Sequence, residues 1–325
     1  MTRKPELTLL YSIAHSYYID NLSQSQIAER ENISRSQISR LLDKAKKLGI
    51  VNITVSLPDD PDTYELMESA AKVLGIREVV IAPVEADVDD PAAISEAIAL
   101  TAAQYLPKAL KDCKTVGLGW GMTMYNMSLR LSYRNLGEDR LYVPLVGVSG
   151  ASNPYLQINT IVDRVAERHR ARSYFVNVPA LKDISNPITK IDEQRIATLE
   201  SYWSRLDAAV FGLGLPPKSG GLFMEEISPR INAEVIASNA AGDMLSYFFH
   251  KDGTTFDFGR NYRHNAFDIR KFRKVRKAIC LAGGADKAEG IFTAARLGYF
   301  NTLITDSNTA KIFYDKFRSG GADIL

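Results

Sequence analysis

The sequence predicts an α/β protein with two parts, a small helical head and a long body built on a largely parallel sheet. Two observations predict this division. The first 50 residues carry apolar side chains at helical spacing, and after residue 64 apolar, β-branched segments alternate with helical stretches. The composition, 46% hydrophobic and 24% charged over 325 residues, is that of a globular protein of about two or three domains.

Three helices are expected in the head. The first presents one apolar stripe, formed by Leu7, Leu10, Tyr11, Ala14, Tyr17 and Tyr18. Ser23 can cap a second helix and Ser34 a third, and Asn32 allows the turn between them. Gly49 ends the third helix. The segment VNITVSLP at 51–58 alternates like a short strand and would form a wing.

The body is expected to contain seven β–α pairs. The strand candidates are EVVIAP, TVGLGW, LYVPLVGV, SYFVNVPAL, LDAAVFGLG, KAICLAGG and NTLITD. The helices that follow them are predicted at 91–111, 122–132, 155–168, 190–204, 230–239, 286–297 and 308–317. Repeated alternation implies a parallel sheet with helices on both faces, while residues 246–277 break it and predict an extra hairpin.

The break PDDPD near residue 60 is rich in proline and acid, and we place the domain boundary there. The head is then 1–57, the linker 58–63 and the body 64–325. Positive charge gathers in the head, which holds eight Lys or Arg and five Asp or Glu in its first 50 residues. A basic segment in a nearly neutral chain is typical of a protein that binds a phosphate backbone, although a solvated helix face would look the same.

Other classes of protein lack support in the sequence. Two distant cysteines make neither a disulfide framework nor a zinc module, and they suit the reducing cytosol. The four histidines are scattered without metal-ligand spacing, so no metal and no cofactor are expected. No apolar run approaches the ~20 residues of a membrane helix, and the N-terminus does not read as a signal peptide, so we expect a cytoplasmic protein without a membrane partner.

The segment 23–42 is spaced like a helix-turn-helix, with the helix after Ser34 as the recognition helix. Arginine can pair with guanine, glutamine with adenine, and serine with phosphates or bases, so double-stranded operator DNA is the expected partner. A structural helical hairpin with a polar surface is the alternative. A head of this size needs an oligomer to present two copies to a palindromic site. The candidate DNA-binding residues are Ser34, Arg35, Ser36, Gln37, Ser39, Arg40 and Lys44.

Four predicted strands end in glycine-rich turns, at 117–123, 144–150, 211–216 and 281–287. In a parallel sheet these carboxyl ends are where ligands bind, and converging amides with a hydroxyl and a lysine suit a phosphate. A glycine after a strand also fits a plain tight turn. Asp243 could cap a helix or accept hydrogen bonds from sugar hydroxyls, and Trp120 could be core or pocket wall. The candidate effector-binding residues are Gly119, Trp120, Gly121, Thr123, Gly147, Asp243, Gly283, Gly284 and Lys287.

These blocks, in this order, resemble the SorC-type sugar-binding transcriptional regulators over nearly the whole chain. The resemblance rests on SQSQIAERENISRSQISRLLDKAKKLGIV, GLGWGMTM, the PLVG strand end, LDAAVFGLG, AAGDMLSYFFHKDG and LAGGADKAEGIFTAARLGYFNTLITDSNTA. It implies a helix-turn-helix head, similar to a winged helix, and a Rossmann-like effector domain similar to sugar-phosphate isomerase and CoA-transferase folds. It also implies a phosphorylated sugar effector, a tetramer, and control of carbohydrate catabolic genes. We expect a repressor that the ligand releases from DNA, with an activator as the alternative.

The resemblance also implies roles by position. Gly121 and Thr123 match a phosphate-side turn, Trp120 an aromatic lining the pocket, and Asp243 an acid that contacts sugar hydroxyls. The turn with Gly283, Gly284 and Lys287 matches a second anion site. Some relatives carry a lysine near the PLVG strand end that forms a Schiff base; PLVGVSG has none, so noncovalent binding is expected.

Two further classes of function compete with a regulator. A sugar-phosphate isomerase-like enzyme could use Asp243 and Lys287 as acid and base, but GLGWGM is not the dinucleotide fingerprint and no G-x-S-x-G is present. A constitutive architectural DNA-binding protein would respond to no ligand. The sequence therefore favours a regulator that is not an enzyme.

Overall fold

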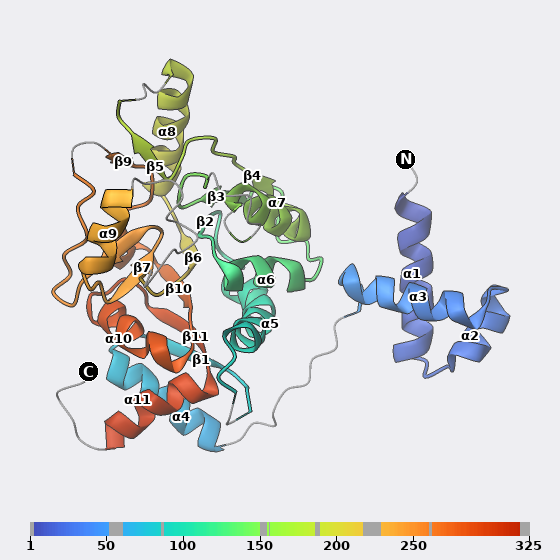
Figure 1. Ribbon diagram of the computed structural model, residues 1–325. Coiled ribbons are helices and arrows are strands. Elements are labelled where there is room, and N and C mark those ends of the chain that lie inside the picture. Colours follow the sequence, from blue (N-terminus) through green and yellow to red (C-terminus); the bar gives the residue numbers. More distant parts are fainter. Residues whose placement is uncertain are drawn as a thin grey trace. The chain divides into compact units, whose positions relative to one another are not determined.

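The computed structural model describes residues 3–51, 61–85, 88–149, 155, 157–185, 189–216, 229–259 and 262–318 (Figure 1). Two compact units make up the chain. The first is Met1–Ser56 with the short segment Leu131–Arg134, and the second is the remainder. Below, the head means residues 3–51 and the body means the described residues from 61 onward.

The head is a three-helix unit with helices α1 (Arg3–Tyr18), α2 (Gln24–Glu31) and α3 (Arg35–Lys47). Ser23 and Ser34 cap α2 and α3, each in a capping box with the glutamine three residues later, which confirms both predicted helix starts. The left-handed residue Asn32, with φ 54°, makes the turn between them. All three helices are held on one core, to which Leu10, Ile13, Ala14, Ile27, Ile38, Leu42 and Ala45 contribute.

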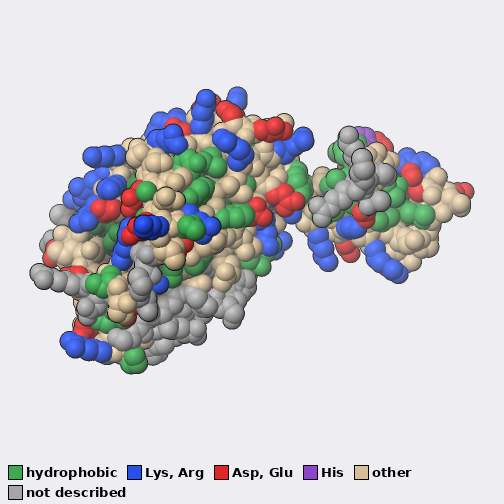
Figure 2. All heavy atoms as spheres, turned by 90° about the horizontal axis from the view of Figure 1, so that it is seen from above, with side chains coloured by type: hydrophobic (Ala, Val, Ile, Leu, Met, Phe, Trp, Pro, Cys, Tyr) green, Lys and Arg blue, Asp and Glu red, His purple; other side chains and the backbone are tan. Residues whose placement is uncertain are grey.

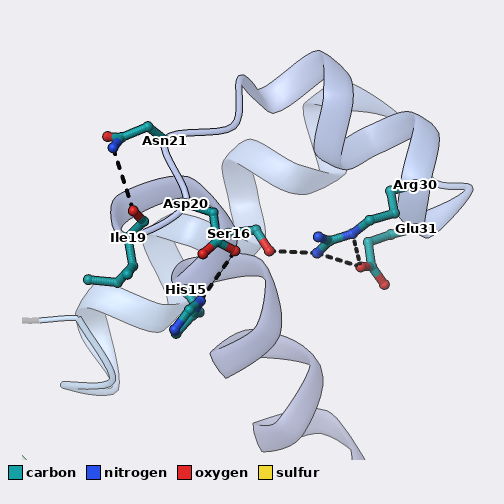
Figure 3. Close-up of polar contacts among 7 residues, drawn as sticks. All are labelled: His15, Ser16, Ile19, Asp20, Asn21, Arg30 and Glu31. Atoms are coloured by element: carbon teal, nitrogen blue, oxygen red, sulfur yellow. Dashed lines mark hydrogen bonds and ion pairs between the residues drawn. The ribbon is translucent and has the colours of Figure 1, made fainter.

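A side-chain contact ties α2 to α1 (Figure 3). Arg30 Nη2 donates to Ser16 Oγ at 2.5 Å, and the same guanidinium pairs with Glu31 at 3.0 Å. Ser16 is buried, so this bond satisfies a hydroxyl that the core would otherwise leave without a partner. Together with the shared core, the contact fixes the crossing of α1 and α2, while the turn at Asn32 and the same core hold α2 and α3 in the predicted helix-turn-helix.

The body is built on a parallel sheet of seven strands in the order β1-β11-β10-β6-β2-β3-β4. Its strands are β1 (Glu78–Ala82), β2 (Thr115–Leu118), β3 (Leu141–Pro144), β4 (Arg172–Ser173), β6 (Ala208–Gly212), β10 (Lys277–Leu281) and β11 (Thr302–Asp306). From β2 the chain adds β3 and then β4 on one side of β2. It then returns to form β6 on the other side of β2 and continues through β10 to β11. The strand order therefore reverses between β2 and β6, and ligands of open α/β sheets bind at such a point.

Two groups of helices pack on the sheet. The first group, α5, α6 and α7, contacts strands across the sheet from β1 to β4. In the second group, α4 and α11 pack by β1 and β11, and α10 contacts α4. The bounds of the body helices are α4 (Pro61–Leu74), α5 (Pro91–Ala109), α6 (Met122–Arg130), α7 (Ile158–His169), α8 (Lys190–Trp203), α9 (Pro229–Ala237), α10 (Ala288–Arg296) and α11 (Ser307–Arg318). The predicted α/β class is confirmed.

Some predicted elements differ from the structure. Helix α4 was not predicted, and it begins at Pro61, inside the expected linker 58–63. The expected strand over 173–181 is reduced to β4 and β5 (Leu181–Asp183), and between them only Pro179 makes an isolated bridge, to Val148. The expected wing lies outside the described residues beyond Val51.

The segment 246–277 contributes to two small antiparallel pairs. One is the predicted extra hairpin, which begins slightly earlier, with β7 (Gly242–Met244) joined to β8 (Tyr247–Phe249). The other pairs β5 with β9 (Tyr262–His264), and a 3₁₀ helix, η3 (Ile269–Lys274), leads into β10. Across the described ranges, no helix is long and apolar enough to span a bilayer.

Candidate DNA-reading helix and effector site

Helix α3 separates its buried face from its polar face as a recognition helix requires. Ile38, Leu42 and Ala45 are buried in the head core. The predicted DNA-contacting side chains lie on the other face. Ser39 is half-buried there. The others are exposed, namely Ser34, Arg35, Ser36, Gln37, Arg40 and Lys44. Basic side chains stand at the surface of the head in Figure 2.

Several of these candidates are engaged within the head. The amide oxygen of Gln37 accepts hydrogen bonds from Ser34 N at 3.2 Å and from Ser34 Oγ at 3.3 Å. Ser36 Oγ is 2.9 Å from Ser34 Oγ, and Lys44 forms an ion pair with Glu6. A glutamine folded back in this way must leave its cap to pair with adenine, which lowers its value as a base reader.

Arg35 and Arg40 are different. They form neither a hydrogen bond nor an ion pair within the described residues of the head, and both are exposed. An uncommitted guanidinium can give two parallel hydrogen bonds to guanine or to a phosphate without first breaking a contact. These two arginines are the strongest DNA-contact candidates of α3.

In the body, the four predicted glycine turns follow the adjacent parallel strands β10, β6, β2 and β3, and the strand order reverses between β6 and β2. Strands β2, β6 and β10 are neighbours, so the turns after them share one edge of the sheet. Gly119 follows β2, and a methyl group there would lie 2.9 Å from Cβ of Phe211 on β6 and 3.0 Å from Leu245 in the β7–β8 hairpin. Gly214 and Asp243 exchange two backbone hydrogen bonds of 2.9 Å, which places Asp243 beside the end of β6.

Thr123 lies in the first turn of α6, directly after β2. Its hydroxyl is 3.0 Å from Ser95 Oγ on α5, and Ser95 is buried. The preceding Gly121 has φ +116°, which lets the chain turn into α6, and its amide donates to the Tyr155 carbonyl at 2.9 Å. Trp120 is 8% exposed and is therefore mainly a core side chain at the rim of this edge. The first-turn amides of α6 and the Thr123 hydroxyl form a place where an anion can bind.

Asp243 carries a carboxyl group that is costly to ionise. Its Oδ1 atom is buried and has no hydrogen-bond partner within the described ranges, and its Oδ2 atom lies close to Gly214. Burial raises the pKa of Asp243 to about 7, and a hydrogen bond from the Ser246 backbone amide offsets part of that rise. Near neutral pH this carboxyl is poised to accept hydrogen bonds or, when protonated, to donate one. Polyol hydroxyls offer both.

The turn after β10 has a different construction from the expected amide cradle. The Gly284 amide donates to Asp306 Oδ2 at 2.9 Å and to Thr309 Oγ1 at 2.8 Å, so it is not available to a ligand. The half-buried Lys287 ends the turn and precedes α10. Cationic contact with an anion here would come from the Lys287 ammonium and not from the Gly284 amide.

Gly147, after β3, has a packing role. A methyl group at this position would lie 2.4 Å from the Val178 carbonyl oxygen and 2.7 Å from the Ala180 nitrogen. The Gly147 amide donates to the Asn265 carbonyl at 2.8 Å. A glycine is required because two backbone segments approach closely, and its amide is already engaged within the chain.

Three residues that the sequence reasoning missed belong to this edge. Ser95 positions the Thr123 hydroxyl, and Asp306 with Thr309 holds the turn after β10. Asp306 lies at the carboxyl end of a predicted strand, where ligands of parallel sheets bind, so the sequence could have indicated it in the same way as the glycine turns. Ser95 carries no comparable signal, because its partner lies on another helix. The described residues contain no group of three His, Cys, Asp or Glu side chains suited to a metal ion.

The edge of the body thus carries the Thr123 hydroxyl, the Lys287 ammonium group and the Asp243 carboxyl, whose pKa is about 7. These groups suit a binding domain for a polar, anionic small molecule. Comparison with known proteins agrees. Residues 62–313 match the family "Putative sugar-binding domain", and the chain belongs to this family. The predicted resemblance to the SorC-type regulators is confirmed.

Individual relatives extend the match to the head. The chain is 28% identical to the Sorbitol operon regulator of Klebsiella pneumoniae, over 96% of this chain and 99% of that one. It is 28% identical to the Deoxyribonucleoside regulator of Bacillus subtilis, over 92% and 94%. The crystal structure of full-length sorbitol operon regulator SorC from Klebsiella pneumoniae matches with TM-score 0.67 and 27% identity, covering 95% of this chain and 99% of that one. These relatives are named as regulators and not as enzymes.

Proposed function

We propose that this protein is a DNA-binding transcriptional repressor of a carbohydrate catabolic operon, controlled by a phosphorylated sugar that binds in the body. One observation carries the proposal: a single chain joins a helix-turn-helix with two uncommitted arginines, Arg35 and Arg40, to a sheet edge with the side chains of a sugar-anion site. A purely architectural DNA-binding protein does not need the sugar-anion site of the body, and a sugar-phosphate enzyme does not need the helix-turn-helix of the head.

The effector is bound without a covalent bond. The phosphate contacts the Thr123 hydroxyl, the first-turn amides of α6 and the Lys287 ammonium, because these are the donors at the edge. The sugar hydroxyls contact Asp243. Trp120, Gly119 and Gly121 shape the rim, while Gly147, Gly283 and Gly284 act through the backbone and not as direct ligands.

The repressor acts as a tetramer in the cytoplasm, with residues 1–57 as the DNA-binding domain and the rest of the chain, from the start of α4 at Pro61, as the domain for effector binding and oligomerisation; the expected linker 58–63 is shortened to the residues before α4. Two heads must occupy half-sites about 34–36 Å apart on one face of the duplex. Effector binding shifts the population between packings of the subunits and so changes the spacing of paired heads. Relief of repression is the expected response.

The test combines ligand binding with DNA binding on the full-length protein. Thermal unfolding is measured with hexose monophosphates, pentose monophosphates and inorganic phosphate, since a ligand at 100 times its Kd adds about 2.7 kcal/mol to stability. Duplexes selected by the protein from random sequences are then released, or not, by the ligand that stabilises it. Lys287→Ala should lose the ligand response and keep DNA binding.

A matched control is Lys108→Ala, which removes an exposed lysine near the end of α5. This variant should respond to the ligand like the wild type. Absence of a thermal shift with every phosphorylated sugar would leave an architectural protein as the better account. Turnover of a sugar phosphate by the purified protein would favour the isomerase-like enzyme instead.

A further inference from the structure

Asp306 holds a fully buried carboxylate at the end of β11, and three donors satisfy it. The Thr309 amide donates to Oδ1 at 2.8 Å, and the Thr309 hydroxyl donates to Oδ2 at 2.6 Å. The Gly284 amide also donates to Oδ2, at 2.9 Å. The first bond is an ordinary N-terminal cap of α11. The bond from Gly284 is not needed for capping, because it comes from the turn after a different strand, β10.

That turn is shaped to admit the carboxylate. A methyl group on Gly283 would lie 2.2 Å from Asp306 Oδ2, so only glycine lets the two segments approach. Gly284 has φ +104°, a conformation that other residues rarely adopt. Its carbonyl accepts the Lys287 amide at 3.0 Å. Two successive hydrogen bonds therefore connect the Asp306 carboxylate to the backbone of Lys287.

Thr309 strengthens this connection with its hydroxyl. Thr309 Oγ1 accepts a second bond from the Gly284 amide at 2.8 Å while it donates to Asp306, so hydroxyl, carboxylate and amide form a closed triangle. The triangle is fully buried, where a hydrogen bond is strong and a lost partner is costly. It allows the turn after β10 few alternative conformations.

Ser307 and Asn308, which lie between Asp306 and Thr309, bind the connection that follows β1. Ser307 Oγ accepts from the Val84 amide at 3.3 Å and donates to the Val84 carbonyl at 3.1 Å. Asn308 Nδ2 donates to the Glu85 carbonyl at 3.1 Å. The short segment 306–309 thus fixes both the connection after β1, which leads to α5, and the turn that leads to Lys287. Helix α5 carries Ser95, the partner of the Thr123 hydroxyl.

We propose that Asp306 and Thr309 are positioning residues of the effector site, which hold the Gly283–Lys287 turn in the conformation that the phosphorylated ligand requires. This inference rests on the proposed function. Neither residue touches the ligand; each acts through Gly284 on the backbone from which Lys287 projects. A turn that already has the binding conformation does not have to be ordered when the ligand binds, so no binding free energy is lost. A loosened turn lowers ligand affinity in proportion to the fraction of molecules in which it has another conformation.

The experiment removes one hydroxyl and compares it with another. Thr309→Val deletes the hydroxyl that bonds Gly284 and keeps the Thr309 amide that caps α11. Thr305→Val is the matched control, because Thr305 is equally buried on β11 and its hydroxyl has no hydrogen-bond partner among the described residues. Thr309→Ser keeps the hydroxyl and should restore binding. Thr309→Ala makes the same deletion if valine fails to pack.

Ligand affinity is measured by calorimetry with the sugar monophosphate that most stabilises the wild type. Thr309→Val should weaken it about tenfold, the effect of a net loss of roughly one buried hydrogen bond. Thr309→Ser and Thr305→Val should lie within about twofold of the wild type, below the effect of one such bond. Affinity for selected DNA without ligand should not change in any variant, which separates positioning from a general loss of structure.

The outcomes distinguish this inference from the proposed function. Wild-type protein that binds no sugar monophosphate refutes the effector site, and the inference with it. If the wild type binds the ligand and both Thr309→Val and Thr309→Ala bind it equally well, the inference about Asp306 and Thr309 is overturned and the proposed function stands. A loss of ligand affinity that Thr305→Val shares to the same degree also overturns it, because the hydroxyl bond to Gly284 would then not be the cause.

Discussion

Replacing Asp243 with asparagine should make the body more stable at pH 8 and change it little at pH 5. Burial raises the pKa of Asp243 to about 7, whereas an unfolded aspartate titrates near its ordinary value of about 3.9. The folded state therefore takes up a proton between these two pH values, and the free energy of unfolding falls as pH rises through that window. From pH 5 to pH 8 this amounts to about 2–3 kcal/mol.

Asparagine keeps the shape of the side chain and cannot ionise, so Asp243→Asn should lack this part of the pH dependence. The comparison between the two proteins is essential because His264 acts in the opposite sense. Burial lowers the pKa of His264 to about 4, so its contribution to stability is complete above about pH 6.5 and is lost as pH falls. His264 is present in both proteins and cancels in the difference.

Tryptophan fluorescence is the appropriate assay. The only two tryptophans of the sequence, Trp120 and Trp203, lie in the body, so thermal unfolding followed by fluorescence reports that unit and not the head. The melting-temperature gap between Asp243→Asn and wild type should widen by roughly 5–10 °C from pH 5 to pH 8, at about 2–4 °C per kcal/mol. Parallel curves for the two proteins would show that Asp243 is hydrated in the folded state and would refute this reasoning.

Three other perturbations test the head and the packing of the body. Arg40→Ala should weaken binding to selected DNA by about 1–3 kcal/mol in a gel-shift titration and leave ligand affinity unchanged; equal loss of both would contradict separate functions. Ser34→Ala removes a helix cap and should lower the stability of the head by about 1 kcal/mol, followed by circular dichroism. Gly147→Ala should destabilise the body by about 1–3 kcal/mol in urea, because its methyl meets backbone atoms. Gly214→Ala is the control, since its methyl would meet Asp243 Oδ2 at an ordinary 3.6 Å; similar urea midpoints for the two alanine variants would disprove the close approach at Gly147.

Local sequence signals predicted the head well. Ser23, Ser34 and Asn32 determine where α2 and α3 start and turn, and each acts on residues within four positions of itself. Helix α4 was missed because its first residue, Pro61, stands in a segment of prolines and acids that reads as a break. Proline is equally typical of the first turn of a helix, and only packing with α11 decides between these two readings.

The site was predictable only in part for a similar reason. The glycine turns follow strands along the chain, so Thr123 and Lys287 could be assigned to one edge from the sequence. The pairing of Ser95 with Thr123 and the capture of the Gly284 amide by Asp306 depend on which segments the fold brings together. The sequence therefore indicated which turns form the site but could not show which of their amides are already engaged.

The sheet order has a consequence for biosynthesis. Strand β1 lies at the edge of the sheet, and its neighbour there is β11, the last strand along the described part of the chain. The head draws its core from residues 10–51 and can fold early, but the body has to wait until almost the entire chain has emerged. A message cut short before residue 302 would yield a folded head attached to an incomplete sheet with unpaired edges, a species prone to aggregate.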